Sequence, residues 1–260
     1  MYIDTHAHLY LSQFDEDRDE VIQRAIDQGI EKILMPNVDL DTVDGMHQLA
    51  QRYPNVCFPM MGLHPCSVDN NYEKVLAQIE SYFHQQNYIA VGEIGLDLYW
   101  DKTFYHQQIE AFRIQASWAH NLDLPIVIHS RESIDEIISL LEKMAIPNLR
   151  GVFHCFTGSV EQASRIKDLG FLVGIGGVVT FKNGGLDKVI PYIDPQYIIL
   201  ETDAPYLAPH PNRGKRNESA YIRVIAQKLC EILSLDHHQL EELTTANARK
   251  LFALADQPKP

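Results

Sequence analysis

Histidines and carboxylates recur at or near the ends of short apolar runs along the chain, and these side chains can bind metal ions and catalyse hydrolysis. The N-terminal run YIDTHAH carries His6 and His8 two residues apart. Later runs carry His64, Glu93, His129, His154, Glu201 and Asp203 in similar positions. Imidazole and carboxylate ligands without thiolates suit divalent ions such as Zn, Mn, Co or Ni. Because the candidate ligands outnumber those of one tetrahedral ion, the sequence predicts two divalent metal ions; Mg is a further candidate.

The segments that must position these residues alternate between strand-like and helical patterns. The eight expected strands cover residues 2–8, 32–38, 56–64, 88–96, 125–130, 151–156, 171–179 and 197–203. Helical spacing follows in residues 19–29, 41–53, 72–85, 109–119, 133–144, 159–170, 185–193, 222–232 and 238–254. This alternation predicts an α/β fold, a (β/α)8 TIM barrel in a single domain spanning residues 1–260. An open doubly wound sheet is disfavoured, because no G-x-G-x-x-G motif follows the first strand.

Active sites of such barrels lie at the C-terminal ends of the strands, where six of the eight expected strands carry a histidine or an acid. Side chains two residues apart on a strand share a face, so His6 and His8 should point the same way. By this rule Asp4 could lie beneath them, and Cys155 should point outward to the helices if His154 points inward. Burying this many titratable groups without a cation would be costly. We therefore expect a metal site at this rim, with Glu93 placed to bridge two ions.

Each candidate also has a structural interpretation when it is taken alone. Glu93 could brace a loop, His154 could be a hydrogen-bonded core residue, and Asp203 could shape a turn before Ala-Pro. Their joint occurrence at strand ends favours the metal site. Six further histidines fall on expected helices or helix edges and are interpreted as solvated: His47, His84, His106, His120, His237 and His238. Trp100 could anchor a loop or stack on a base, and we favour the anchor.

Composition narrows the classes of function. The chain has 22 Lys and Arg against 35 Asp and Glu, a formal charge of −13, which argues against a broad basic face for duplex nucleic acid. Bound divalent cations could still reverse the local field in a pocket. The four scattered cysteines are interpreted as reduced thiols. No apolar run approaches the length of a membrane helix and no signal peptide is evident, so we expect a cytoplasmic protein without membrane association or an obligate protein partner. The tail at residues 256–260 is expected to fray.

Six short motifs occur in a defined order along the chain: D-T-H-A-H-L, G-L-H-P, G-E-I-G-L-D, H-S-R, H-C-F-T-G and E-T-D-A-P-Y. Together they resemble the TatD family of metal-dependent deoxyribonucleases, which have amidohydrolase-like barrels. The resemblance extends from about Tyr2 to Phe252.

The resemblance implies specific roles for these residues. It places His6, His8 and Asp203 on one metal ion, His129 and His154 on the second, and Glu93 on both. It also implies that His64 contacts the substrate phosphate and that the activity is that of a 3′→5′ deoxyribonuclease.

The expected mechanism is phosphodiester hydrolysis by a water molecule that two metal ions activate. The catalytic residues would be Glu93 and Asp203, with Asp203 orienting the water or accepting its proton. His64 and Arg131 are candidate substrate-binding residues, although Arg131 could instead pair with Glu132 or Asp135. A basic cluster near the rim, either a guide for nucleic acid or a solvated loop, consists of Arg213, Lys215 and Arg216. The expected substrates are DNA ends, single-stranded DNA or a small phosphoester.

Three alternatives remain open from the sequence, and no residue discriminates for or against one of them, the cleavage of an aminoacyl or phosphate monoester. The first is an amidohydrolase-type enzyme acting on a small amide, lactone or ester metabolite. Many such barrels bridge their metals through a carbamylated lysine on the fourth strand, whereas the fourth expected strand here contains Glu93 and no lysine. The second is a binding protein with a structural metal, which would need only four ligands.

Overall fold

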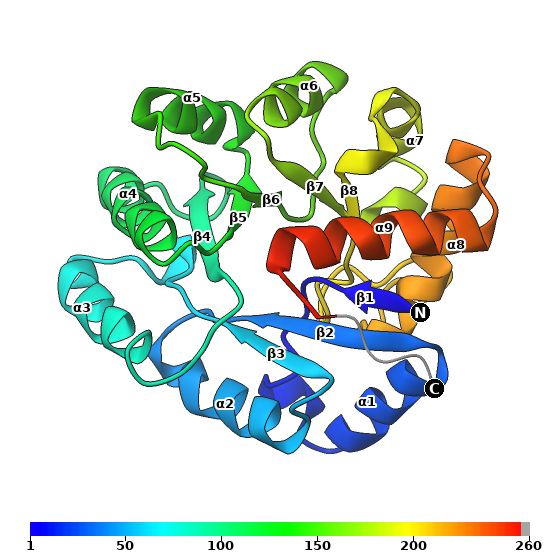
Figure 1. Ribbon diagram of the computed structural model, residues 1–260, viewed down its shortest axis with the longest axis horizontal. Coiled ribbons are helices and arrows are strands. Elements are labelled where there is room, and N and C mark those ends of the chain that lie inside the picture. Colours follow the sequence, from blue (N-terminus) through cyan, green and yellow to red (C-terminus); the bar gives the residue numbers. More distant parts are fainter. Residues whose placement is uncertain (256–260) are drawn as a thin grey trace.

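The computed structural model describes residues 1–255, so the tail expected to fray lies outside the described residues. Strands alternate with helices, and the helices surround the strands (Figure 1). The strands are β1 (Tyr2–Asp4), β2 (Ile30–Pro36), β3 (Cys57–Met60), β4 (Val91–Asp97), β5 (Ile126–Arg131), β6 (Gly151–Phe153), β7 (Leu172–Ile175) and β8 (Ile198–Leu200). The helices are α1 (Arg18–Asp27), α2 (Val43–Arg52), α3 (Tyr72–Tyr82), α4 (Tyr105–Asn121), α5 (Ile134–Met144), α6 (Val160–Asp168), α7 (Leu186–Val189), α8 (Ile222–Leu233) and α9 (His237–Phe252).

The strands pair in parallel, in chain order. β1 to β3 form one sheet and β4 to β8 form a second. Isolated parallel bridges lie at the two seams, one between Ala7 and Ala204 and one between Met61 and Val91. At one seam the Asp203 N–H donates to the carbonyl of His6 at 2.8 Å. The prediction of a (β/α)8 barrel is therefore confirmed, with ladders that are interrupted at the seams.

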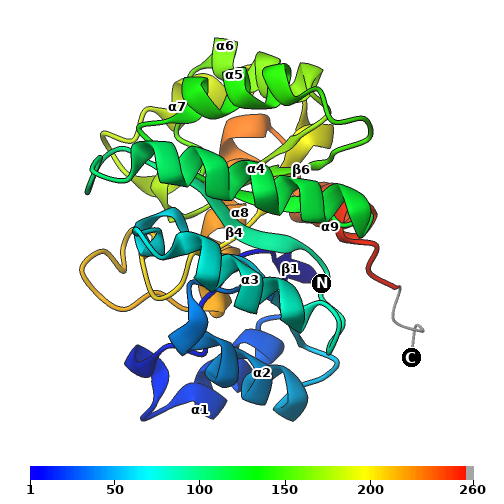
Figure 2. The same cartoon turned by 90° about the vertical axis from the view of Figure 1, so that its left-hand side faces the viewer.

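The barrel interior is apolar at the N-terminal end of the strands. Its buried residues come from the strands or their edges and are Ile3, Leu34, Met60, Ala90, Val127, Val152 and Ile199. Leu251 and Phe252 of α9 pack against this layer. Figure 2 shows α9 at one end of the molecule and the long loop between β8 and α8 at the other. The C-terminal ends of the strands are thus the end left for polar residues.

The helices bury one face each against the outside of the strands. In α8, Ile222, Ile225 and Leu229 are fully buried, as the spacing predicts. Gly29 and Gly170 follow α1 and α6 with left-handed φ of 76° and 81°, so these helices end close to the ends of the expected helical segments, residues 19–29 and 159–170. Within residues 1–255, no helix combines the length and apolarity that crossing a bilayer requires.

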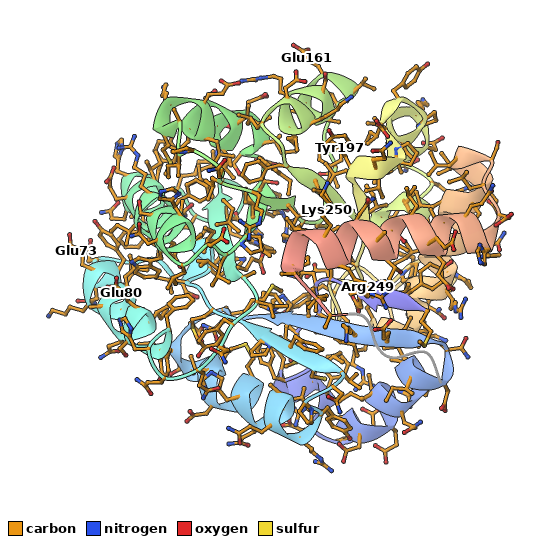
Figure 3. The ribbon with its side chains drawn as sticks, viewed as in Figure 1. Glu73, Glu80, Glu161, Tyr197, Arg249 and Lys250 are labelled. Atoms are coloured by element: carbon orange, nitrogen blue, oxygen red, sulfur yellow. The ribbon has the colours of Figure 1, made fainter. Side chains whose placement is uncertain are left out.

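Acidic residues project from the outer helices, and this placement locates much of the negative charge. Glu73 and Glu80 of α3 and Glu161 of α6 are exposed and point away from the strands (Figure 3).

One of the histidines expected at the surface is not exposed. His47 of α2 is buried, with its Nε2 2.8 Å from the Tyr88 hydroxyl, so the expectation that it is solvated is wrong.

Several strands end earlier than the apolar runs predict. β1 ends at Asp4, β6 at Phe153 and β8 at Leu200, so His6 and His154 follow the ends of strands. After β1, side-chain alternation therefore does not extend into the site. Because Ile3 faces the barrel interior, Asp4 faces the other way and accepts a hydrogen bond from the Thr202 hydroxyl at 2.6 Å. Asp4 does not lie beneath the histidines.

Candidate metal centre

Two histidines and two carboxylates, from β4 and from the segments that follow β1 and β8, converge on one point. The Nε2 atoms of His6 and His8 lie 3.2 Å apart, and His6 Nε2 is 3.1 Å from Glu93 Oε2. The Asp203 Oδ1 atom is 3.7 Å from His6 Nε2 and 3.6 Å from His8 Nε2. Two ring nitrogens cannot face each other stably unless a proton or a cation lies between them. This donor set fits a divalent ion.

A second set of donors meets the other oxygen of the same carboxylate. Glu93 Oε1 is 2.8 Å from both His129 Nδ1 and His154 Nε2. Ligand atoms of His6, Glu93 and His154 lie within 4.8 Å of one another, as do those of His64, Glu93 and His129. Glu93 is 2 % exposed and separates the two groups, with Oε2 toward one and Oε1 toward the other. That orientation is what a bridging carboxylate requires.

The far ring nitrogens of two of the histidines, His8 and His129, have fixed partners. The Tyr10 hydroxyl donates to the Pro36 carbonyl, so it accepts from His8 Nδ1 at 2.8 Å. Asp97 Oδ2 accepts from His129 Nε2 at 2.8 Å. Each partner holds the proton on the outer nitrogen and leaves the inner lone pair for a metal.

Glu201 lies beside His154 at ion-pair distance. Its Oε1 lies 3.5 Å from His154 Nδ1 and accepts a hydrogen bond from the Cys155 N–H. A Cβ atom added at Gly174 would lie 2.2 Å from Glu201 Oε2, so only glycine leaves room for this carboxylate. Glu201 therefore acts on His154 as a nearby buried charge, which raises the pKa of that ring.

His64 differs from His8 and His129 because its protonated ring nitrogen is the one that faces the site. Its Nδ1 accepts a hydrogen bond from the Cys66 N–H at 3.1 Å, so the proton resides on Nε2. That Nε2 faces the site, 3.4 Å from Glu93 Oε1. A protonated ring nitrogen cannot bind a metal but can donate to an anionic oxygen. The geometry thus fits the predicted substrate contact and not a ligand role.

The histidines and carboxylates of the site shift one another's pKa values. Burial alone would raise the pKa of Glu93, but His154, His64 and neighbouring histidines hold it well below its usual value. Burial would lower the pKa of His154, but Glu93 and Glu201 raise it well above the ordinary value. The pKa of His129 is also raised: burial would lower it, but hydrogen bonds that its ring donates to the Asp97 and Glu93 carboxylates outweigh this effect. Protons on these two histidines therefore balance the carboxylates when no cation does.

Cys155 does not point outward as the alternation rule predicts. Its φ of 47° is left-handed and turns the chain directly after His154. Burial raises the pKa of its thiol well above the ordinary value, and the nearby Asp203 and Glu201 carboxylates add to this. The thiol thus lies among the site carboxylates, because the strand ends two residues before it.

Three further expectations concern the rim. Arg131 does not pair with Asp135, which binds Arg165 instead. Trp100 is 69 % exposed, so the favoured interpretation as a buried loop anchor is wrong. In the basic cluster, Arg216 makes two hydrogen bonds of 2.7 Å to Asp17 and is not available as an isolated charge.

Sequence reasoning gave no specific role to three residues that lie beside the histidines. Asp97 lies four residues after Glu93 in the motif G-E-I-G-L-D, and Tyr10 lies two residues after His8. Glu201 was counted among the acids at the strand ends, without a role of its own. Their positions beside ligand-bearing segments are the one signal that could have indicated them.

Comparisons with known proteins cover nearly the whole chain. The family model described as "TatD related DNase" matches residues 3–253. An uncharacterized metal-dependent hydrolase of Bacillus subtilis, YabD, is 36% identical over 255 residues, which are 98% of this chain and 100% of that protein. The 3′-5′ ssDNA/RNA exonuclease TatD of Pectobacterium parmentieri is 32% identical over 97% of this chain and 99% of its own length. The crystal structure of YjjV, a TatD homologue from Escherichia coli, matches with a TM-score of 0.92 at 29% identity, over 98% of each chain.

Proposed function

The chain belongs to the TatD family of metal-dependent hydrolases, and we propose that it hydrolyses phosphodiester bonds at the ends of single-stranded DNA in the 3′→5′ direction. The relative named as a 3′-5′ exonuclease on single-stranded DNA and RNA supports this choice of substrate. The observation that carries the proposal is the orientation of Glu93, whose two oxygens face two separate groups of histidines.

The residues proposed to hold two divalent ions are those of the two groups. His6, His8 and Asp203 would hold one ion, His129 and His154 the other, and Glu93 both. Two such ions lower the pKa of a water molecule and offset the charge that develops on a phosphate. Nitrogen and oxygen donors fit Zn, Mn, Co or Ni, and Mg remains a candidate.

The chain's own residues would position substrate and water. His64 would donate from Nε2 to a non-bridging phosphate oxygen, and Arg131 would supply further N–H donors. Burial would raise the pKa of Asp203, but its hydrogen bond with His8 and the charge of His154 lower it. The Asp203 carboxylate therefore stays ionised and can accept a hydrogen bond from the attacking water. This side chain is 14 % exposed and so can be reached from the mouth of the site.

The alternative of an amide- or lactone-cleaving enzyme has less support. β4 contains Glu93 where the carbamylated enzymes of this architecture carry a lysine, and no lysine lies between Val91 and Asp97. A structural metal is disfavoured because the two groups offer more ligands than a closed site needs.

The test compares metal-stripped and metal-loaded protein on labelled single-stranded DNA. We expect the stripped protein to be inactive and Mg²⁺ or Mn²⁺ to restore turnover. Glu93→Ala should lower turnover by more than about 100-fold, beyond the loss typical of residues that only support a ligand. The matched control is Glu73→Ala on the exposed face of α3. End-labelled substrates report polarity, and cyclic amides and lactones are assayed in parallel. Unchanged turnover of Glu93→Ala would count against the scheme.

A further inference from the structure

Two adjacent aromatic side chains are exposed in the loop between β4 and α4. Trp100 and Tyr99 are 69 % and 49 % exposed, although each is large and apolar enough to be buried. Their rings meet nearly at a right angle, 86°, with centroids 4.9 Å apart. The two rings are thus nearly perpendicular, and most of the Trp100 surface remains in contact with solvent.

Arg131 connects these rings to the metal centre. Its guanidinium lies 4.0 Å from the centre of the Tyr99 ring and 5.3 Å from that of Trp100. Arg131 is two residues beyond His129 on β5, and its carbonyl accepts the Leu98 N–H at 3.0 Å. Since none of the ion pairs within residues 1–255 involves Arg131, its N–H donors are available to a ligand.

Asp97 fixes the distance between the aromatic loop and the histidines. One carboxylate oxygen accepts the N–H groups of Tyr99 and Trp100, each at 3.0 Å. The other accepts from His129 Nε2 at 2.8 Å. One side chain therefore orients both a candidate metal ligand and the loop that carries the two rings.

We propose that Trp100, supported by Tyr99 and Arg131, stacks an unpaired nucleobase of the nucleotide whose phosphate lies at the metal centre. This inference rests on the proposed function and specifies how the substrate is recognised. A flat indole surface accepts any base, so the site would be tolerant of sequence. A base within a duplex is already stacked on its neighbours, so the site would favour single strands and frayed ends.

The charge of the protein supports a stacking contact. A chain with a formal charge of −13 cannot draw its affinity for nucleic acid from a broad basic face. Contacts that do not depend on net charge must then supply much of the binding, and stacking on an aromatic ring is such a contact.

The first experiment uses Mn²⁺-loaded protein and single-stranded oligonucleotides that carry or lack a base at each of the last two positions. For the unaltered protein, loss of the stacked base should raise KM about tenfold to 100-fold. Trp100→Ala should raise KM for the intact strand by a similar factor and abolish the discrimination, and Trp100→Phe should retain it. Tyr192→Ala removes another exposed aromatic, 75 % exposed before β8, and should behave as the unaltered protein. Equal KM values with and without either base would overturn the proposal.

A second measurement separates this inference from the proposed function. The chain has two tryptophans, and Trp118 is buried against Phe83, so Trp118→Phe leaves Trp100 as the fluorophore. Deoxyadenosine monophosphate should quench this fluorescence, whereas deoxyribose 5-phosphate should not. Quenching without cleavage of any DNA would keep the stacking site and refute the nuclease. Cleavage without quenching or base discrimination would keep the nuclease and refute the stacking site.

Discussion

Replacing Asp97 by asparagine should weaken one metal site and leave the other unchanged. The carboxylate accepts three hydrogen bonds, one from His129 Nε2 and two from the backbone of the loop. The amide oxygen of asparagine can still accept both backbone N–H groups. Its NH2 group then faces His129, which must turn its lone pair outward and carry the proton on Nδ1. The nitrogen that faces Glu93 would no longer be able to bind a metal.

The expected loss follows from the nature of this contact. Residues that hold a metal-binding histidine typically contribute 10- to 100-fold in metal affinity, about 1.4–2.7 kcal/mol. The asparagine variant should lose this amount at the site formed by His129 and His154. The site formed by His6, His8 and Asp203 has its own orienting contact at Tyr10 and should keep its affinity.

The assay is a titration of metal-free protein with Zn²⁺ or Mn²⁺ against a chromophoric chelator, which resolves two binding steps. Asp101→Asn is the matched control, because Asp101 also accepts a backbone N–H in the same loop, that of Thr103 at 2.8 Å, and the substitution removes the same charge. One metal-binding step should weaken in the Asp97→Asn variant, and neither step should weaken in the Asp101→Asn variant. Equal titration curves for the two variants, or equal weakening of both steps, would refute the reasoning.

Two further predictions concern protons and the apolar end of the barrel. Because the pKa values of His129 and His154 are raised, their protonated forms stabilise the metal-free fold at low pH, and this contribution is lost as the pH rises through those pKa values. Metal binding near neutral pH should therefore release protons and weaken as the pH falls. Calorimetry in buffers of different ionisation enthalpy would detect the released protons, and their absence would contradict the prediction. Phe252→Ala should lower the free energy of unfolding, measured in urea, by about 3–5 kcal/mol and leave metal affinity unchanged. The control is Val160→Ala on the exposed part of α6, which should change the free energy of unfolding little. A loss of metal affinity in proportion to stability would show that the two ends of the barrel are not independent.

The arrangement of elements could be predicted because it depends on local patterns. Apolar runs and helical spacing alternate, and Gly29 and Gly170 stop two helices where the pattern indicates. The rim of the barrel then gathers the residues that follow the strands. The alternation rule failed at two places, after Asp4 and at Cys155. Strand pairing has ended by these residues, and the backbone turns there.

The orientation of the histidines could not be predicted in the same way. A sequence shows an imidazole but not which of its nitrogens carries the proton, since that depends on partners that folding brings near. His64 and His129 occupy comparable places after β3 and on β5, yet a backbone N–H two residues along fixes one and Asp97 fixes the other. The burial of His47 could not be predicted either, because it depends on contact with Tyr88, which is distant in the sequence.

The combination of these contacts bears on how an acidic protein could act on an acidic polymer. The outer helices carry exposed carboxylates, whereas the mouth presents His64 Nε2, Arg131 and the Trp100 ring. A strand of nucleic acid would be repelled along most of the surface and held only where a cation, a donor and an aromatic face coincide. Binding of that kind requires an unpaired end and cannot use a long duplex. The proposed specificity for ends would then follow from the distribution of charge as much as from the metal centre itself.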